Sequence, residues 1–239
     1  MMKWNIFSRL TVASAMSICA IAALAQESDT AVTSAVTQPT ETNVFAEKIT
    51  GHSVFAGGGI GQIMSEFDAY WASGDPQFAG MWQLGYEWVS KKRFGAGFLY
   101  NGYYTKGSFL YYDTFKESIC IHYLAPQFVG RVAFGKGRWL FGYGAGVGLV
   151  VLVDRLRYRE DNYVSYREVG KNTDYGFGVN MYLGAEYRLT TTWGIFGRLS
   201  YTEALLKQEF MGQEMHRDDG NVNGFSRIEL SVGVRYNFQ

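Results

Sequence analysis

The feature that most constrains this chain is a strict two-residue alternation over residues 227–238. One set of positions is apolar or aromatic: Ile228, Leu230, Val232, Val234, Tyr236 and Phe238. The intervening set is charged, polar or small: Arg227, Glu229, Ser231, Gly233, Arg235 and Asn237. Successive side chains of a strand point to opposite faces, so the pattern predicts a β-strand with one apolar and one polar face.

The same alternation recurs through most of the chain after Thr50. Seven further segments carry it: residues 53–64, 80–88, 94–105, 124–134, 141–153, 177–189 and 193–202. The first of these, SVFAGGGIGQIM, is so rich in Gly that the pattern does not define its two faces. Together with the last segment, the pattern predicts eight strands and an all-β fold.

Turn lengths agree with this assignment. Trp88 and Phe94, Phe134 and Trp139, and Leu189 and Trp193 bound turns of five, four and three residues, read from the sequence. Each length places the apolar faces of two consecutive strands side by side. The other connections are long, at about 65–78, 107–117, 154–173 and 206–222. An antiparallel meander therefore gathers all four long connections at one end.

The first 25 residues read as a cleaved secretory signal peptide. Lys3 and Arg9 precede an apolar stretch, and Ala23-Leu24-Ala25 resembles a cleavage site. The alternative, a membrane anchor, needs a longer apolar run than this one. Residues 26–50 are rich in Thr, Ser, Ala and Gln and are predicted to be a flexible periplasmic segment, which leaves 51–239 for the strands. After cleavage Cys120 is the one remaining cysteine, so no intramolecular disulfide is expected.

Composition limits the classes of partner and the orientation of the faces. The formal net charge is zero and no basic run occurs, which argues against a nucleic-acid ligand. A soluble ligand-binding barrel would turn the apolar faces inward. The polar faces are instead crowded with Gly, which suits a narrow lumen. Tryptophans flank the short turns (Trp88, Trp139 and Trp193), and tyrosines flank the long connections (Tyr103, Tyr104, Tyr175 and Tyr201). Two such girdles are typical of a barrel in a bilayer.

The end of the chain adds a motif. Ser231, Gly233, Tyr236 and Phe238 fit the pattern polar, x, Gly, two residues, aromatic, x, aromatic. The segment resembles the assembly signal of small outer-membrane β-barrels of the OmpA/OmpX type, although Gln239 follows the final aromatic residue. The resemblance implies an eight-stranded antiparallel up-and-down transmembrane β-barrel in the outer membrane of a Gram-negative cell. It also implies contact with the barrel-assembly machinery and with lipid that includes lipopolysaccharide. No peptidoglycan-binding domain is expected after Phe238.

The polar faces predict what fills the lumen. The charged residues that point inward are Glu87, Arg131, Glu186, Arg188, Arg198, Arg227, Glu229 and Arg235. An eight-stranded barrel is only wide enough for its own side chains, and desolvated charges must be paired. We therefore expect an interlocked polar plug, with an excess of arginine that leaves room for an anion or waters. This predicts a structural or surface-interaction barrel; the alternative is a narrow porin-like channel for ions or small solutes.

Catalysis, cofactors and metals have little support in the sequence. His52, His122 and His216 are far apart in the sequence and do not have the spacing of metal ligands. No serine lies two residues from a histidine in the outer half of the barrel, where a catalytic Ser–His pair would be expected. No catalytic, cofactor or metal site is therefore predicted. An outer-membrane lipid hydrolase or acyltransferase is the less favoured alternative.

The loops suggest further contacts. Arg155, Arg157 and Arg159 keep the outward parity beyond the apolar belt, where they could meet lipid phosphates; the alternative is a solvated charged edge. Pairing across the 154–173 hairpin requires an odd loop or a bulge, which we place at Gly170. A short helix is predicted over 203–215. The loop ligand stays open, and a monomer is expected.

Overall fold

A computed structural model of the chain describes residues 50–64, 78–109, 115–134, 137–158, 167–207, 209–210, 213–214 and 224–238. The predicted signal peptide, residues 26–49 of the flexible segment, Arg159 and His216 lie outside these ranges. The regular elements within them are strands. In this part of the chain no helix is long and apolar enough to cross a membrane.

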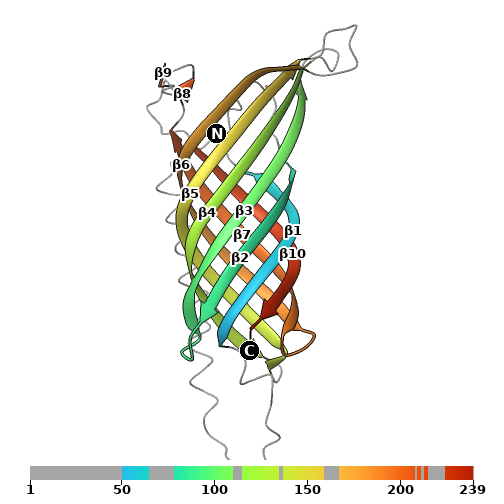
Figure 1. Cartoon of the computed structure of the whole chain (residues 1–239), viewed down its shortest axis with the longest axis vertical. Coiled ribbons are helices and arrows are strands. Elements are labelled where there is room, and N and C mark those ends of the chain that lie inside the picture. Colours follow the sequence, from blue (N-terminus) through green and yellow to red (C-terminus); the bar gives the residue numbers. More distant parts are fainter. Residues whose placement is uncertain are drawn as a thin grey trace, which may run out of the picture. The chain divides into compact units, whose positions relative to one another are not determined.

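Eight long strands form a closed antiparallel barrel (Figure 1). They are β1 (Gly51–Ile63), β2 (Ala79–Val89), β3 (Phe94–Phe109), β4 (Phe115–Phe134), β5 (Trp139–Tyr158), β6 (Arg167–Arg188), β7 (Trp193–Lys207) and β10 (Gly224–Asn237). Their order is β1-β10-β7-β6-β5-β4-β3-β2, so consecutive strands are neighbours and β10 closes onto β1. Two short strands, β8 (Glu209–Phe210) and β9 (Gln213–Glu214), form a separate sheet. The predicted eight-stranded up-and-down barrel is confirmed.

Three short turns lie at one end of the barrel, called here the short-turn end. Phe134 pairs directly with Trp139, and the Leu189 N–H donates to the Trp193 carbonyl at 2.9 Å, as the turn lengths predicted. The first turn differs: β2 continues to Val89, and Trp88 pairs with Ala96 rather than Phe94. This shift of two residues keeps both apolar faces on the same side.

Strands β3 to β6 reach further into the long connections than the sequence indicated. β5 and β6 contain 20 and 22 residues, about twice the ~9–11 that cross a bilayer obliquely. The expected bulge is present: pairing shifts between Leu156 and Arg157, which leaves Val169, the neighbour of Gly170, as the extra residue. The prediction was wrong by one position.

The helix predicted over 203–215 is wrong where this segment is described. Residues 203–207 continue β7, and β8 and β9 follow. Ala204 and Leu206 are buried while Leu205 is 40% exposed, so the alternation of β7 simply continues. Pairing with β6 and β10 on both sides satisfies this backbone, which removes any need for helical hydrogen bonds.

The apolar faces point out of the barrel. Val232 is 68% exposed and Val147 is 60% exposed, whereas the neighbouring Ser231 is 1% exposed. Trp88, Trp139 and Trp193 are exposed near the short turns, and Tyr104 and Tyr175 are exposed towards the other end. A soluble barrel would show the opposite placement. An uninterrupted exposed apolar belt around a polar interior is the arrangement that a bilayer requires.

The lumen is filled by two kinds of layer. Charged and polar side chains occupy its short-turn half and its middle. Towards the long connections lies an apolar cluster that includes Tyr103, Ile121, Tyr123, Leu152 and Phe225, with Asp154 and Asp174 buried beside it. Tyr103 is 0% exposed, so its predicted place in the outer girdle is wrong. Tyr103 points inward like Asn101 and Thr105, two residues before and after it. Of the two adjacent tyrosines, only Tyr104 faces outward.

Candidate functional site

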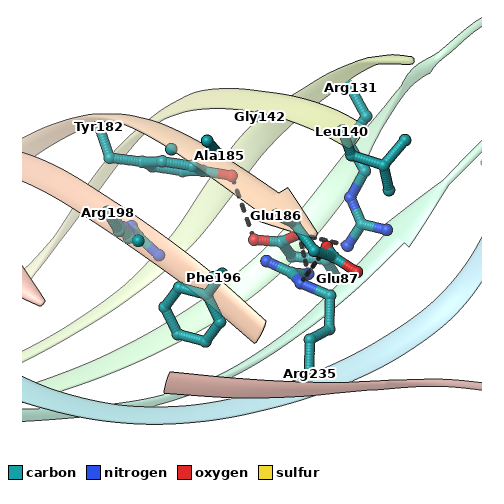
Figure 2. A pocket seen from close by; sticks show the side chains of 12 residues that line it. Glu87, Arg131, Leu140, Gly142, Tyr182, Ala185, Glu186, Phe196, Arg198 and Arg235 are labelled. Atoms are coloured by element: carbon teal, nitrogen blue, oxygen red, sulfur yellow. Dashed lines mark hydrogen bonds and ion pairs between the residues drawn. The ribbon is translucent and has the colours of Figure 1, made fainter. Parts of the chain in front are cut away.

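Glu87 is the hub of the lumen near the short turns (Figure 2). Its Oε2 accepts from Arg131 Nη2 at 2.7 Å and from Arg235 Nη1 at 2.6 Å. Its Oε1 accepts from the Tyr182 hydroxyl at 3.1 Å. The same two arginines donate to Ser53 Oγ at 2.6 and 3.0 Å. One carboxylate from β2 thus joins β1, β4, β6 and β10 across the lumen.

Glu186 completes this network from β6. Its Oε2 lies 3.0 Å from Arg235 Nε, and its Oε1 accepts from Asn237 Nδ2 at 3.4 Å. The Arg235 guanidinium also lies over the ring of Phe55, 4.8 Å from the centroid. The neighbouring Arg188 is fully buried at the end of β6. Charges in this half are therefore held by ion pairs, amides and ring faces rather than by solvent.

A second network occupies the middle of the lumen. Arg227 Nε lies 2.9 Å from Glu229 Oε1, and Arg227 Nη2 donates to Asn101 Oδ1 at 2.8 Å. Asn101 Nδ2 and Ser200 Oγ donate to Glu229 Oε2 at 2.9 and 3.1 Å. The Arg227 guanidinium covers the Tyr103 ring at 4.8 Å, which joins this network to the apolar cluster.

The structure thus brings six of the eight predicted inward charges into two groups, with Arg188 and Arg198 buried beside them, and adds partners that the sequence analysis did not name. These partners are Ser53, Phe55, Tyr182 and Phe196. Tyr182 lies on the same face of its strand as Asn180 and Glu186, and Phe196 on the same face as Arg198. The alternation could therefore have predicted that both rings point inward. Phe55 and Ser53 lie in the Gly-rich first strand, where the alternation gave no faces.

A small cavity lies beside the Glu87 network. Its volume is about 20 Å³, and its lining includes Arg198, Glu186, Phe196, Gly142 and Gly184. Gly142 and Gly184 face each other on β5 and β6 and contribute no side chain to the space. A Cβ built at Gly142 would meet nothing closer than 3.9 Å, so the cavity has space for a methyl group at this position.

The segment predicted as the assembly signal forms the seam of the barrel. Ser231 points into the lumen and accepts from Gln83 Nε2 at 2.6 Å. Gly233 lies so close to β1 that a Cβ there would come within 2.2 Å of the Ala56 carbonyl oxygen. Tyr236 packs on Trp193 and on Phe238, with ring centroids 4.9 and 5.3 Å apart. The two aromatic residues therefore also support the short-turn end of β10.

A cationic face lies above the apolar belt on β3 to β6. Arg155 pairs in register with Ser118 on β4 and Lys171 on β6, and Arg157 pairs with Lys116. Lys106 pairs with Ser118 and completes the face; of these five cationic side chains Arg155 is half-buried and the other four are exposed. The lysines escaped the sequence analysis because they come from separate strands and converge only through the register.

The two histidines that the structure describes, His52 and His122, lie on the outside of the barrel. His52 Nδ1 is hydrogen-bonded to the Tyr86 hydroxyl. His122 lies between the Tyr100 hydroxyl, 2.9 Å from Nδ1, and the Cys120 thiol, 3.3 Å from Nε2. Neither described histidine has a serine partner, and the described residues hold no group of three or more potential metal ligands.

Comparisons with known proteins find similarity in structure alone. No protein-family model matches the chain, and no curated protein sequence does. Neisserial surface protein A matches with a TM-score of 0.47 and 13% identity, over 79% of this chain and 98% of that one. Ail, the attachment invasion locus protein of Yersinia pestis, matches with a TM-score of 0.48 and 9% identity, over 79% and 99%.

A third solved structure is the outer membrane protein OprG from Pseudomonas aeruginosa, with a TM-score of 0.42 and 12% identity, over 80% of this chain and 97% of that one. At identities this low, the similarity concerns the fold and nothing finer. The assignment rests on the molecule itself: eight strands closed by β1 and β10, an exposed apolar belt and a polar lumen. The chain has the fold of the small outer-membrane β-barrels of the OmpA/OmpX type.

Proposed function

We propose that this protein is a structural and surface-interaction barrel of the outer membrane, with a lumen closed to bulk flow and long loops on the cell surface. The observation that carries the proposal is the filling of the lumen. The carboxylates Glu87, Glu186 and Glu229 are each ion-paired with buried arginines. An apolar layer lies above them, and Tyr103 and Phe225 in it are 0% and 1% exposed.

Conductance tests this proposal against its main alternative, a narrow channel. The full chain in a planar bilayer should show no steady single-channel steps, because side chains occupy the width of an eight-stranded barrel. Large and stable steps from the unmodified protein would replace the structural role with the channel. The ~20 Å³ cavity beside Arg198 favours that alternative only weakly, because it holds one or two small molecules and gives no continuous path.

We further propose that the cationic face contacts the phosphates of outer-membrane lipid, including lipopolysaccharide. Lys106, Lys116, Arg155, Arg157 and Lys171 come from four adjacent strands just above the belt, where headgroup phosphates lie. Ammonium and guanidinium groups form charge-assisted hydrogen bonds with phosphate oxygens. Several cations held on one rigid sheet can engage one multiply charged headgroup at once.

Native mass spectrometry with lipopolysaccharide tests this contact. Replacing Arg155 and Arg157 by Gln should reduce the fraction of barrel that retains lipopolysaccharide by at least several-fold. The matched control replaces Lys91 and Lys92 by Gln, because these exposed cations lie in a turn at the short-turn end. Equal losses in both variants would indicate a nonspecific effect of charge and would overturn the proposed contact.

The loops are proposed to bind the physiological partner, and the barrel is proposed to act as a monomer without enzymatic activity. Crosslinking through the loops on intact cells would capture a partner and also report a second copy of the chain. Comparison of membrane lipids with and without the protein tests the enzymatic alternative. A change in acyl composition that depends on His122 would support a lipid-modifying enzyme instead.

A further inference from the structure

The cavity in the short-turn half of the barrel carries an unbalanced charge. Its lining includes three arginines, Arg131, Arg198 and Arg235, and two glutamates, Glu87 and Glu186. Both glutamates are already engaged, Glu87 by Arg131 and Arg235, and Glu186 by Arg235. One positive charge is therefore in excess around the cavity, and geometry assigns it to Arg198.

Arg198 lacks the partners that its neighbours have. The residue is 3% exposed, and its Nη2 donates a long hydrogen bond of 3.4 Å to Gln127 Oε1. Its Nε and Nη1 are buried and have no hydrogen-bond partner among the described residues. The flat face of the guanidinium is covered by the Tyr182 ring at 3.6 Å. Figure 2 shows it apart from the Glu87 network, with no dashed line to any residue drawn.

A guanidinium does not lose its proton in a protein, so this buried cation must be compensated in another way. Water molecules could accept from Nε and Nη1 but would leave the charge unbalanced. A carboxylate side chain from the protein would compensate it, but both carboxylates that line the cavity face Arg235. A small anion in the cavity would accept from one of the two donors and neutralise the charge.

The dimensions select the class of anion. A cavity of about 20 Å³ exceeds the ~10–15 Å³ that one water molecule needs, but it is far too small for a phosphate, a sulfate or a lipid headgroup. The space exists because Gly142 and Gly184 carry no side chain. The ring of Phe196 and the side chain of Leu140 also line the cavity. A monatomic monovalent anion fits both the size and the single excess charge.

We propose that this cavity is a binding site for one small monovalent anion of the halide class, held by an N–H donor of Arg198 that lacks a partner in the protein. The site lies inside the barrel wall formed by β5, β6 and β7, and it is independent of the loops and of any loop ligand. Its role is to complete the charge balance of the plugged lumen, so the anion is a structural part of the folded barrel.

Bromide is the probe for the test. The full chain is folded in detergent micelles, and urea unfolding is followed at constant ionic strength while bromide replaces gluconate. A ligand that binds only the folded state raises the folded-to-unfolded ratio in proportion to its concentration above Kd. We expect that ratio to rise up to tenfold for each tenfold increase in bromide above Kd. Sulfate at matched ionic strength should give no such rise.

Two variants separate the site from a general salt effect. Arg198→Gln removes the donors, and Gly142→Ala fills part of the cavity without touching Arg198, since its Cβ meets nothing closer than 3.9 Å. Both should lose the dependence on bromide, whereas Lys91→Gln, at an exposed position in a short turn, should keep it. If Arg198→Gln does not fold, Gly142→Ala decides alone.

Crystals grown in bromide give the direct answer. An anomalous peak within hydrogen-bond distance of Arg198 Nε or Nη1 is the expected result. The proposal is overturned if wild-type stability does not depend on bromide, or if Gly142→Ala retains the full dependence. Either outcome would mean that water alone fills the cavity.

Discussion

At the residue scale, the lumen depends on a few carboxylates that each bind several partners. Glu87 is 1% exposed and accepts from Arg131, Arg235 and Tyr182. A buried ion pair adds little net stability over an apolar pair of the same size, but removal of one partner leaves the other charge uncompensated. The same reasoning makes Glu229, which is bound by Arg227, Asn101 and Ser200, the centre of the second group.

Glu87→Ala should therefore destabilise the barrel by about 3–5 kcal/mol, because two buried arginines lose their shared carboxylate. Unfolding in urea, followed by the heat-dependent shift in electrophoretic mobility, measures the change. Glu168→Ala is the control, since Glu168 is exposed on β6 and should change stability by about 0.5 kcal/mol or less. Equal stability of Glu87→Ala and the wild type would show that water or an anion replaces the carboxylate without cost.

At the element scale, β10 closes the barrel and also carries the terminal motif that is proposed to be recognised during assembly. Its inward residues contribute to both lumen networks, through Arg235 near the turns and through Arg227 and Glu229 in the middle. Gly233 allows its close approach to β1, where any Cβ would meet the Ala56 carbonyl. Its outward aromatic end packs on β7 through Tyr236 and Trp193. A strand of this kind closes the barrel and is also the proposed recognition segment for assembly.

The two roles can be separated by experiment. Replacing Tyr236 and Phe238 by Ala should lower the amount of folded barrel in cells and increase its degradation in the periplasm. Trp193→Ala is the matched control, because it removes the same ring contact with Tyr236 from the β7 side and leaves the terminal motif intact. If both variants reduce folded barrel equally, the motif acts through packing alone and the assembly role is wrong.

At the scale of the whole molecule, the proposed closed lumen consists of two barriers in series. In this proposal the polar groups close the short-turn half and the middle. The apolar cluster around Tyr103, Ile121 and Phe225, with Asp154 and Asp174 buried beside it, closes the half towards the long connections. An ion would have to cross both. Strands β3 to β6 also extend beyond the apolar belt (Figure 1).

Opening one barrier should therefore not produce a channel. Tyr103→Ala combined with Phe225→Ala removes two large side chains from the apolar cluster and should leave planar bilayers silent. Addition of Glu87→Ala to that pair should give fluctuating conductance, because both barriers are then weakened. Steady steps from the Tyr103 and Phe225 changes alone would show that the polar groups do not close the lumen.

The sequence by itself determined the strand count, the faces of every strand but the first, and two of the three short turns. Each of these is a local property: alternation over residues 227–238 states which side chains share a face, and a turn of known length states which residues meet across it. For the same reason the inward position of the eight charged residues named above, from Glu87 to Arg235, could be predicted. Asp154 and Asp174 are also buried but lie beyond the segments in which the alternation was read. The local pattern failed where it is weak, as for Phe55 in the Gly-rich first strand, and where two tyrosines adjoin, as at Tyr103 and Tyr104. It also failed over 203–207, where β7 continues in place of the predicted helix.

The partners across the lumen were decided by the tertiary structure alone. Glu87 and Arg235 are 148 residues apart in sequence and meet only because closure of β1 onto β10 and the tilt of the strands bring them to one height. The convergence of Lys106, Lys116 and Lys171 beside Arg155 depends on the register of four strands. The cavity at Arg198 requires two glycines on adjacent strands to face each other. Periodicity tells which way a side chain points, whereas barrel closure and stagger decide what it meets.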